Sequence, residues 1–305
     1  MLKLKISCVI FFTSYSIISQ IGNYNHFPTL KPFHILDNGL RNISFALSMR
    51  ILESEYDGPL IRLRRASDDE EKDFYWGDNN KVDVNAINAW RNGSDVFVHT
   101  WYDQSNLGRN AVQTEKTAQP QFFPEPIRPY FKGDGVKDYL IIDTPNGIQD
   151  VTNAGDQGTV IGVIKAAGKN DEYTFGVSVG HNRWSAHLNW GNGLNYFDPG
   201  RCCNGVRSYD NKINSDVWQV YVFIKTDTNS IIRTGKEEKI NGEFTHLNCT
   251  LMLDFAIGWS NNGNINPENQ GHSIASFTEL IMYRTDINAD QYKKIEENSA
   301  DFWDL

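Results

Sequence analysis

The sequence has little cysteine and, beyond its first residues, no long apolar run. Four cysteines occur in 305 residues, and the first lies at position 8, within the apolar N-terminal stretch. So few cysteines exclude a fold held together by a disulfide framework, and the hydrophobic core must therefore supply the stability. Past that stretch, no segment reaches the roughly 20 apolar residues that a membrane-spanning helix needs.

The N-terminal stretch has the features of a secretory signal peptide. Lys3 and Lys5 make a positive start, the next residues are mostly apolar, and Ser19 gives a cleavage site. We predict a signal peptide over residues 1–19, an irregular lead-in over 20–36 and one domain over 37–305, in a protein that is secreted or held at the cell surface. A membrane anchor is the alternative, but threonine and serine interrupt the apolar core.

Basic charge is also scarce. The chain has 29 Lys and Arg against 38 Asp and Glu, a formal net charge of -9. Removal of residues 1–19 takes away two lysines and no acidic residue, which makes the net charge -11. Because an acidic chain is repelled by phosphate backbones, nucleic acid is not an expected partner.

Two polar loops are candidate cation or ligand sites. The stretch Ser67–Asp73, "SDDEEKD", holds five acidic residues, and several oxygen ligands of this kind suit Ca²⁺. A solvated turn is the alternative. The stretch Tyr102–Asn110, "YDQSNLGRN", is rich in turn formers, so a structural loop is favoured over a ligand loop. We find no motif for any other cofactor.

Helical patterns are few, whereas short β patterns recur with Gly, Asn, Asp and Pro clusters between them, which predicts an antiparallel β-sandwich. Helices are expected only at Asn85–Trp90 and at Asp286–Trp303, where Asn288 and Gln291 form a capping box. The predicted strands are Leu60–Ser67, Asp95–Asp103, Tyr139–Asp143, Thr159–Ala166, Tyr173–Gly180, Arg183–Trp190, Trp218–Thr226, Leu251–Trp259 and Ser276–Arg284.

Two segments of the first half carry a family resemblance. Ala46–Phe74 contains "SEYDGPLIRLRRASDD", and Val96–Gln113 contains "YDQSNLGRNAVQ". In order and rough separation these segments resemble the start of the catalytic domain of the α-L-arabinofuranosidase B family.

The second half resembles concanavalin A-like, laminin G-like domains. "PYFKGDGVKDYLIID" (Pro129–Asp143) resembles one of their strand entries, and Gly271–Ile295 resembles their closing strand and helix. "RWSAHLNWGNGLNYFDPGRCC" (Arg183–Cys203) resembles an "H-L-P-W…Y-F-D-x-G-x-C-C" segment found in some of them. The combined resemblance covers most of residues 44–302. It implies a two-sheet antiparallel jelly-roll sandwich of the lectin/glucanase type with a C-terminal helix.

The arabinofuranosidase resemblance implies a retaining glycosidase, which needs two carboxylates. The family's nucleophilic Glu follows an Asp by two residues. Here Asp198 takes the place of that Asp, and Gly200 stands where the Glu is expected. The family's acid/base Asp falls on Ser260. No catalytic residue is therefore assigned, although Asp254 or Glu268 would take such a role in another alignment.

Cys202 and Cys203 are neighbours in "NYFDPGRCCNGVR". Three states stay open: a disulfide between them, which we favour, a bridge from one of them to Cys249, and reduced thiols. A disulfide between neighbours closes a minimal loop, so it adds little chain-entropy stabilisation. It is better explained as a rigid turn surface. The resembled family also has an adjacent cysteine pair, which lines its sugar pocket but lies earlier in the strand order.

Aromatic residues and amides around this turn predict a sugar site, because an aromatic face suits the C–H face of a sugar ring and polar groups fix its hydroxyls. Core packing is the alternative for each aromatic residue. The function expected is that of a lectin-like, glycan-binding protein without catalysis. A glycoside hydrolase with displaced carboxylates and a structural or adhesive surface protein are the alternatives. The predicted site residues are Trp190, Asp198, Cys202, Cys203, Arg207, Trp259 and Asn261.

Overall fold

Strands outnumber helices in the part of the chain that the computed structural model describes, which is residues 34–37, 41–166, 172–203, 205–210, 216–244, 247–264 and 271–305. The strands are β1 (Ile43–Ser48), β2 (Ile61–Arg65), β3 (Glu71–Phe74), β4 (Val96–Trp101), β5 (Ala111–Val112), β6 (Gln121–Phe123), β7 (Tyr130–Lys132), β8 (Leu140–Ile142), β9 (Gly158–Lys165), β10 (Phe175–Val179), β11 (Asn182–His187), β12 (Leu194–Arg201), β13 (Ser208–Asp210), β14 (Trp218–Lys225), β15 (Asn229–Thr234), β16 (Glu237–Glu243), β17 (Phe255–Ile257) and β18 (Ser276–Tyr283). The helices are α1 (Val84–Arg91), α2 (Ile148–Val151), α3 (Ala289–Trp303) and the 3₁₀ turn η1 (Lys116–Ala118).

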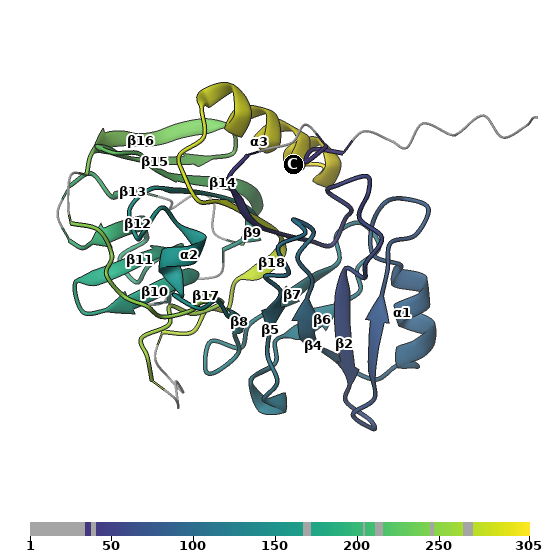
Figure 1. The fold of residues 1–305 in the computed structure, drawn as a ribbon. Helices are drawn as coiled ribbons and strands as arrows, with labels where there is room; N and C mark the ends of the chain where they lie inside the picture. Colours follow the sequence, from purple (N-terminus) through teal and green to yellow (C-terminus); the bar gives the residue numbers. More distant parts are fainter. Residues whose placement is uncertain are drawn as a thin grey trace, which may run out of the picture. The chain divides into compact units, whose positions relative to one another are not determined.

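Strand pairing arranges these elements in two antiparallel ladders (Figure 1). The first ladder has the order β1-β18-β9-β14-β15-β16. The second has the order β5-β8-β17-β10-β11-β12-β13. The remaining strands, in the order β3-β2-β4-β6-β7, join the two, because β4 pairs with β5 and β7 pairs with β18. The result is one continuous sheet that folds over on itself.

Buried aromatic rings fill the space between the two ladders. Phe45 of β1 lies 5.4 Å from Phe255 of β17, and Phe223 of β14 lies 5.4 Å from both Phe175 of β10 and Phe197 of β12. Burial of each such ring contributes about 2 to 3 kcal/mol. The predicted all-β sandwich with a C-terminal helix is confirmed, whereas its jelly-roll connectivity remains a prediction.

Helix α3 begins where the capping box was predicted. The Asn288 side chain accepts a hydrogen bond from the Gln291 backbone, and the Gln291 side chain accepts one from the Asn288 backbone. Tyr292, Ile295 and Trp303 of this helix are buried. The helix packs on β9 and β14 of the first ladder (Figure 1) and leaves the second ladder uncovered by it.

A buried ion pair joins α3 to the first ladder. Glu279 of β18 accepts bonds from Arg50 at 2.6 and 3.0 Å, and also from the Ser299 hydroxyl and the Trp303 indole. Burial alone raises the pKa of Glu279, but the positive charge of Arg50 and these hydrogen bonds outweigh burial and lower it. The carboxylate is therefore fully satisfied although it lies in an otherwise apolar strand.

The loop at Tyr102–Asn110 is held in place by hydrogen bonds of Asp103 and Gln104. The Asp103 carboxylate accepts bonds from the backbone of Ala46, Ser105 and Arg109 at 2.8 to 3.0 Å. The Gln104 side chain is buried and bonds to backbone groups of the neighbouring segment. The polar atoms of these two residues therefore bind this protein's own backbone.

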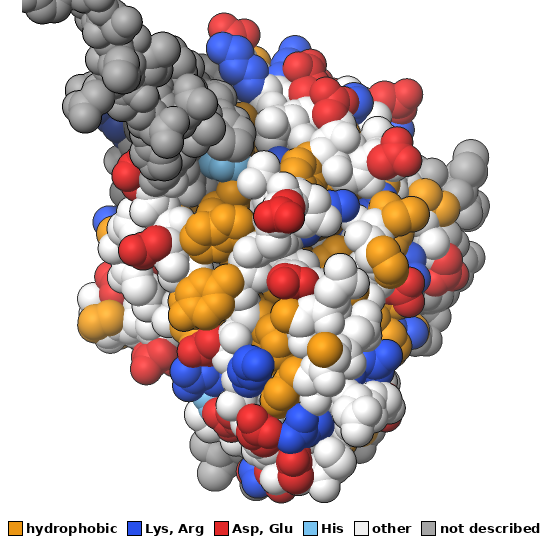
Figure 2. Space-filling view, turned by 90° about the vertical axis from the view of Figure 1, so that its right-hand side faces the viewer, with side chains coloured by type: hydrophobic (Ala, Val, Ile, Leu, Met, Phe, Trp, Pro, Cys, Tyr) orange, Lys and Arg blue, Asp and Glu red, His pale blue; other side chains and the backbone are white. Residues whose placement is uncertain are grey.

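The acidic stretch Ser67–Asp73 faces basic side chains. Arg65 pairs with Asp68 at 2.6 Å, and Arg62 pairs with Asp73 through two bonds of 2.8 Å. Hydrogen bonds from Arg65 lower the pKa of Asp68. On the face shown in Figure 2, acidic and basic side chains are interspersed. A bound Ca²⁺ at this stretch stays a prediction from the sequence alone.

Two expectations about strands differ from the structure. The predicted strand Leu251–Trp259 is reduced to the three residues of β17, which ends where the backbone turns at Gly258 with φ +83°. The segment Asp198–Gly200 has the Asp-Pro-Gly composition that is typical of a turn, but it lies inside β12. Pro199 is tolerated there because β13 pairs only with Leu194 to Tyr196, so the proline nitrogen faces no partner strand in that ladder.

Candidate functional site

The β11–β12 hairpin sets apart a core face and an outer face. Residues directly opposite each other in an antiparallel pair share one face. Trp184 and Phe197 face the core, where their rings meet edge to face at 5.1 Å. Ser185 lies opposite Asp198, and His187 opposite Tyr196, so these residues share the outer face of the second ladder.

Asp198 is the centre of a charged cluster on this outer face. Its side chain is fully buried, and Arg207 binds both carboxylate oxygens, with the Nη2 to Oδ2 bond at 2.7 Å. His187 Nε2 lies 3.4 Å and Arg183 Nη1 3.6 Å from Oδ2. Burial by itself raises the pKa of Asp198, but the hydrogen bonds and charges of His187 and Arg207 outweigh it and lower the pKa to about 2. Asp198 is therefore an ionised, neutralised anchor at physiological pH.

The two positions that the family resemblance marks as catalytic carry no carboxylate. Gly200 has φ +128°, and a side-chain carbon placed there would lie 2.7 Å from the Leu247 carbonyl oxygen. The backbone therefore leaves no room for a larger residue. Ser260 is buried and has no acidic function. Asp198 itself is surrounded by cations, which makes it a poor proton donor.

Aromatic side chains border the charged cluster. Trp190 is half-buried and meets the edges of Tyr173 at 5.6 Å and His187 at 4.9 Å. The Arg207 guanidinium lies 4.4 Å from the centre of the Tyr196 ring, which is a cation–π contact. Three of the predicted site residues, Trp190, Asp198 and Arg207, thus belong to one connected group.

A hollow of about 540 Å³ opens beside this group, next to Arg183. This volume is within the range of small-molecule sites. Tyr173 forms an aromatic part of the wall and Val179 an apolar part, and the other lining residues are polar or glycine. The hollow is lined by Tyr173, Ser178, Val179, Gly180, Arg183, Asn262, Gly263 and Asn264.

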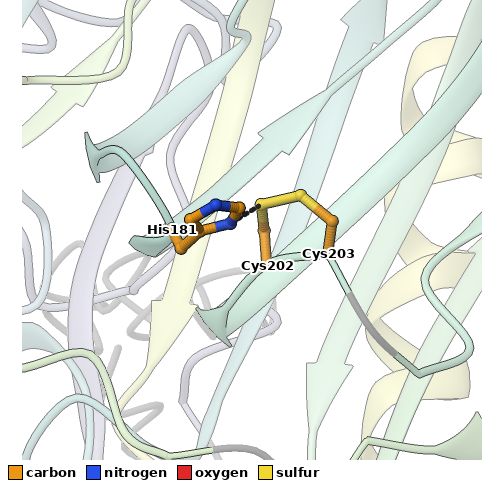
Figure 3. A group of neighbouring side chains, drawn as sticks. All are labelled: His181, Cys202 and Cys203. Carbon is orange, nitrogen blue, oxygen red and sulfur yellow. Dashed lines mark hydrogen bonds between the residues drawn. A yellow bond between two sulfur atoms is a disulfide. The ribbon is translucent and has the colours of Figure 1, made fainter.

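The cysteine pair lies at the other end of the hairpin. Cys202 and Cys203 directly follow β12 and form the predicted disulfide with each other (Figure 3). Because Cys202 and Cys203 bind each other and Cys249 is a free, buried thiol, a bridge to Cys249 and a reduced pair are wrong. Burial raises the pKa of Cys249 to about 11. At about 3.3 Å per residue, the ends of β12 are roughly 23 Å apart. The disulfide and Trp190 therefore do not share one small pocket.

Two further predicted residues, Trp259 and Asn261, do not line the hollow. Trp259 is 2% exposed, and its ring stacks on His272 with centroids 5.3 Å apart. It offers no ring face to a ligand. The Asn261 backbone pairs with Val177 of β10, and its side chain bonds to the Asp254 carbonyl oxygen and the Gly263 amide. Asn261 therefore shapes the loop beside the hollow.

Three residues of the outer face were missed from the sequence: Tyr173, Arg183 and His187. One signal was available. In "RWSAHLNW" the polar residues Arg183, Ser185 and His187 alternate with apolar ones, and such alternation places polar side chains together on one face of a strand.

The fold and this face define the class of protein as an antiparallel β-sandwich whose outer sheet face is polar and bordered by aromatic side chains.

No protein-family model matches the chain, and no curated protein sequence matches it. A solved arabinofuranosidase complexed with arabinofuranosyl-α-1,2-xylobiose matches with a TM-score of 0.65 at 14% identity, over 87% of this chain and 63% of that one. A GH54 α-L-arabinofuranosidase soaked with a cyclic sulfate inhibitor matches with a TM-score of 0.66 at 13% identity, over the same shares.

The chain therefore spans less than two thirds of the solved structures it matches. At this identity, the likeness shows a shared fold. It agrees with the family resemblance of the two motif segments in the first half of the sequence. No helix in the described ranges is long and apolar enough to cross a membrane.

Proposed function

We propose that this protein is a secreted, lectin-like carbohydrate-binding protein whose site is the hollow on the outer face of the second ladder. The observation that carries the proposal is the position of Tyr173. Tyr173 lines the hollow. Its ring also contacts the His187 ring, with centroids 4.4 Å apart, and His187 in turn contacts the buried Asp198. A wall held in this way is pre-organised for a ligand.

The chemistry of the wall suits a sugar. The Tyr173 ring offers an apolar surface for the C–H face of a sugar ring. The Ser178 hydroxyl and the Arg183 guanidinium offer polar groups for sugar hydroxyls. The shared fold with arabinofuranosidases, one of them solved with arabinofuranosyl-xylobiose, supports a glycan as the ligand. The predicted leader and the disulfide support an extracellular location, because disulfides persist in oxidising compartments.

Binding without hydrolysis is favoured by the charge balance of the cluster. A retaining mechanism needs one carboxyl group that carries a proton near neutral pH and a second that is ionised. The pKa of Asp198 is lowered to about 2, and the hydrogen bonds and charges of His187 and Arg207 hold it there against the effect of burial. Such a carboxylate serves to position its neighbours.

A hydrolase with displaced carboxylates is the second candidate, and one pair of residues favours it. Phe255 pairs with Ile142, so Asp254 and Asp143 come next in register on the outer face. Opposed Cβ atoms lie about 5 Å apart, similar to the carboxyl separation of retaining enzymes. Burial and the charge of Asp143 raise the pKa of Asp254. A second hollow of about 540 Å³ is lined by Gly108, Asn110, Val112, Gln113, Thr114, Tyr139, Ile141 and Asp143.

A glycan array combined with hydrolysis of an aryl α-L-arabinofuranoside separates the candidates. The proposal predicts binding to at least one glycan class and no turnover. Turnover that Asp254→Asn abolishes, with Asp301→Asn as the control, would establish the second candidate. Absence of both binding and turnover would leave a structural or adhesive protein and would refute the proposal.

A further inference from the structure

Three metal-ligating side chains meet where the β10–β11 turn approaches the end of β12 (Figure 3). They are His181, in that turn, and Cys202 and Cys203. The Cys202 amide donates to the His181 carbonyl oxygen at 2.8 Å, and Cys202 Sγ lies 3.5 Å from His181 Nδ1. The ligand atoms of all three residues lie within 4.8 Å of one another.

We propose that reduction of the Cys202–Cys203 disulfide converts this group into a binding site for a thiophilic divalent cation such as Zn²⁺. A thiol or phosphine reductant supplies two electrons, the S–S bond breaks, and two protons are taken up to give two thiols. The thiol reductant becomes a disulfide, or the phosphine an oxide with oxygen from water. Cation binding then releases the two protons and forms two metal–sulfur bonds and one metal–nitrogen bond.

The geometry of the group suits a tetrahedral ion. Zinc binds sulfur at about 2.3 Å and imidazole nitrogen at about 2.0 Å, and a tetrahedral angle then places the two atoms about 3.5 Å apart. Cys202 Sγ and His181 Nδ1 are already 3.5 Å apart. After reduction the two sulfurs must separate to about 3.8 Å to share the ion. Cys203 is exposed and has room to make this movement, whereas Cys202 is held by the His181 backbone.

Exposure and ligand type determine access and selectivity. Cys202 is 3% exposed, but Cys203 and His181 are open to solvent, so an ion reaches the group from outside. Two thiolates and an imidazole favour zinc and softer ions over Ca²⁺ and Mg²⁺. Three protein ligands leave the fourth position for water. Because a disulfide offers no thiolate, the site exists only in the reduced protein, which makes metal capture dependent on redox conditions.

The test measures zinc in the folded full-length protein by competition with a chromophoric chelator under anaerobic conditions. The phosphine-reduced protein is expected to hold one zinc per chain, and the oxidised protein none. Cys203→Ser is expected to abolish binding, and His181→Ala to weaken it at least tenfold. Cys249→Ser is the matched control, since this thiol is buried elsewhere and its loss should leave zinc binding unchanged.

A second readout keeps the test decisive if a variant is unstable. Co²⁺ added to the reduced wild-type protein should give the sulfur-to-metal charge-transfer band of a thiolate site, and prior alkylation of the exposed Cys203 thiol should remove it. Equal zinc binding by oxidised and reduced protein would overturn the proposal. So would the absence of binding after reduction, or binding that survives both Cys203→Ser and His181→Ala.

Discussion

Replacement of Asp198 by Asn tests the charged cluster that supports the proposed site. Asn keeps the shape of the side chain and resembles the protonated acid. The pKa of Asp198 is about 2 in the folded protein, against an ordinary value of 3.8. Because one pKa unit is worth about 1.4 kcal/mol, ionisation of this group stabilises the fold by roughly 2.5 kcal/mol at pH 7. Asp198→Asn should therefore lower the free energy of unfolding by about that amount.

The effect of Asp198→Asn on the free energy of unfolding should depend on pH in a definite direction. A carboxylate whose folded pKa lies below its unfolded pKa stabilises the fold fully above the unfolded value, and this stabilisation is lost as pH falls through the folded value. The difference between wild type and Asp198→Asn should shrink from pH 4 to pH 2. Urea denaturation followed by tryptophan fluorescence measures it, with the exposed Asp301→Asn as control. A loss below 0.5 kcal/mol at pH 7, or the same acid slope in both proteins, would refute the reasoning.

Three further predictions concern other parts of the molecule. Glu279→Gln leaves the buried Arg50 without its partner charge and should cost about 3 to 5 kcal/mol, seen as a lower denaturation midpoint. Gly176→Ala places a carbon 2.1 Å from the Trp184 carbonyl oxygen at φ +114°, so it should destabilise by more than about 1 kcal/mol in the same assay. Mass spectrometry of the exported protein should find Gln20 as its first residue, and an intact leader would contradict the predicted cleavage.

Periodicity in the sequence predicted best the strands that are long apolar runs. Strands such as β9, β14 and β18 are nearly continuous apolar runs, so their burial is visible in the sequence. Strand β16, "EEKINGE", was missed because it is a mostly exposed edge strand, and edge strands carry charged residues that hide a β pattern. Strand β12 is not among the predicted strands, and Asp-Pro-Gly within it hides its β pattern because these residues usually mark a turn.

The sequence predicted only those residues of the candidate site that lie close to the cysteine pair along the chain. Asp198 and Arg207 were found because they flank the cysteine pair. Tyr173 joins the site through ring contacts with His187 and Trp190, which the sequence does not display, whereas the alternation around Arg183 was a signal that the prediction did not use. Trp259 was misplaced for a physical reason: it precedes an Asn-rich turn, which is typical of exposed residues, but the chain folds back there and buries its ring.

The most direct test of the account is a titration of Tyr173→Ala with the glycan that the array selects. Loss of the aromatic wall should weaken binding about tenfold or more, which corresponds to about 1.4 kcal/mol. Tyr75→Ala, an exposed tyrosine outside the hollow, should bind as the wild type does. Equal affinity of Tyr173→Ala and wild type for that glycan would contradict the claim that the hollow on the outer face of the second ladder binds carbohydrate.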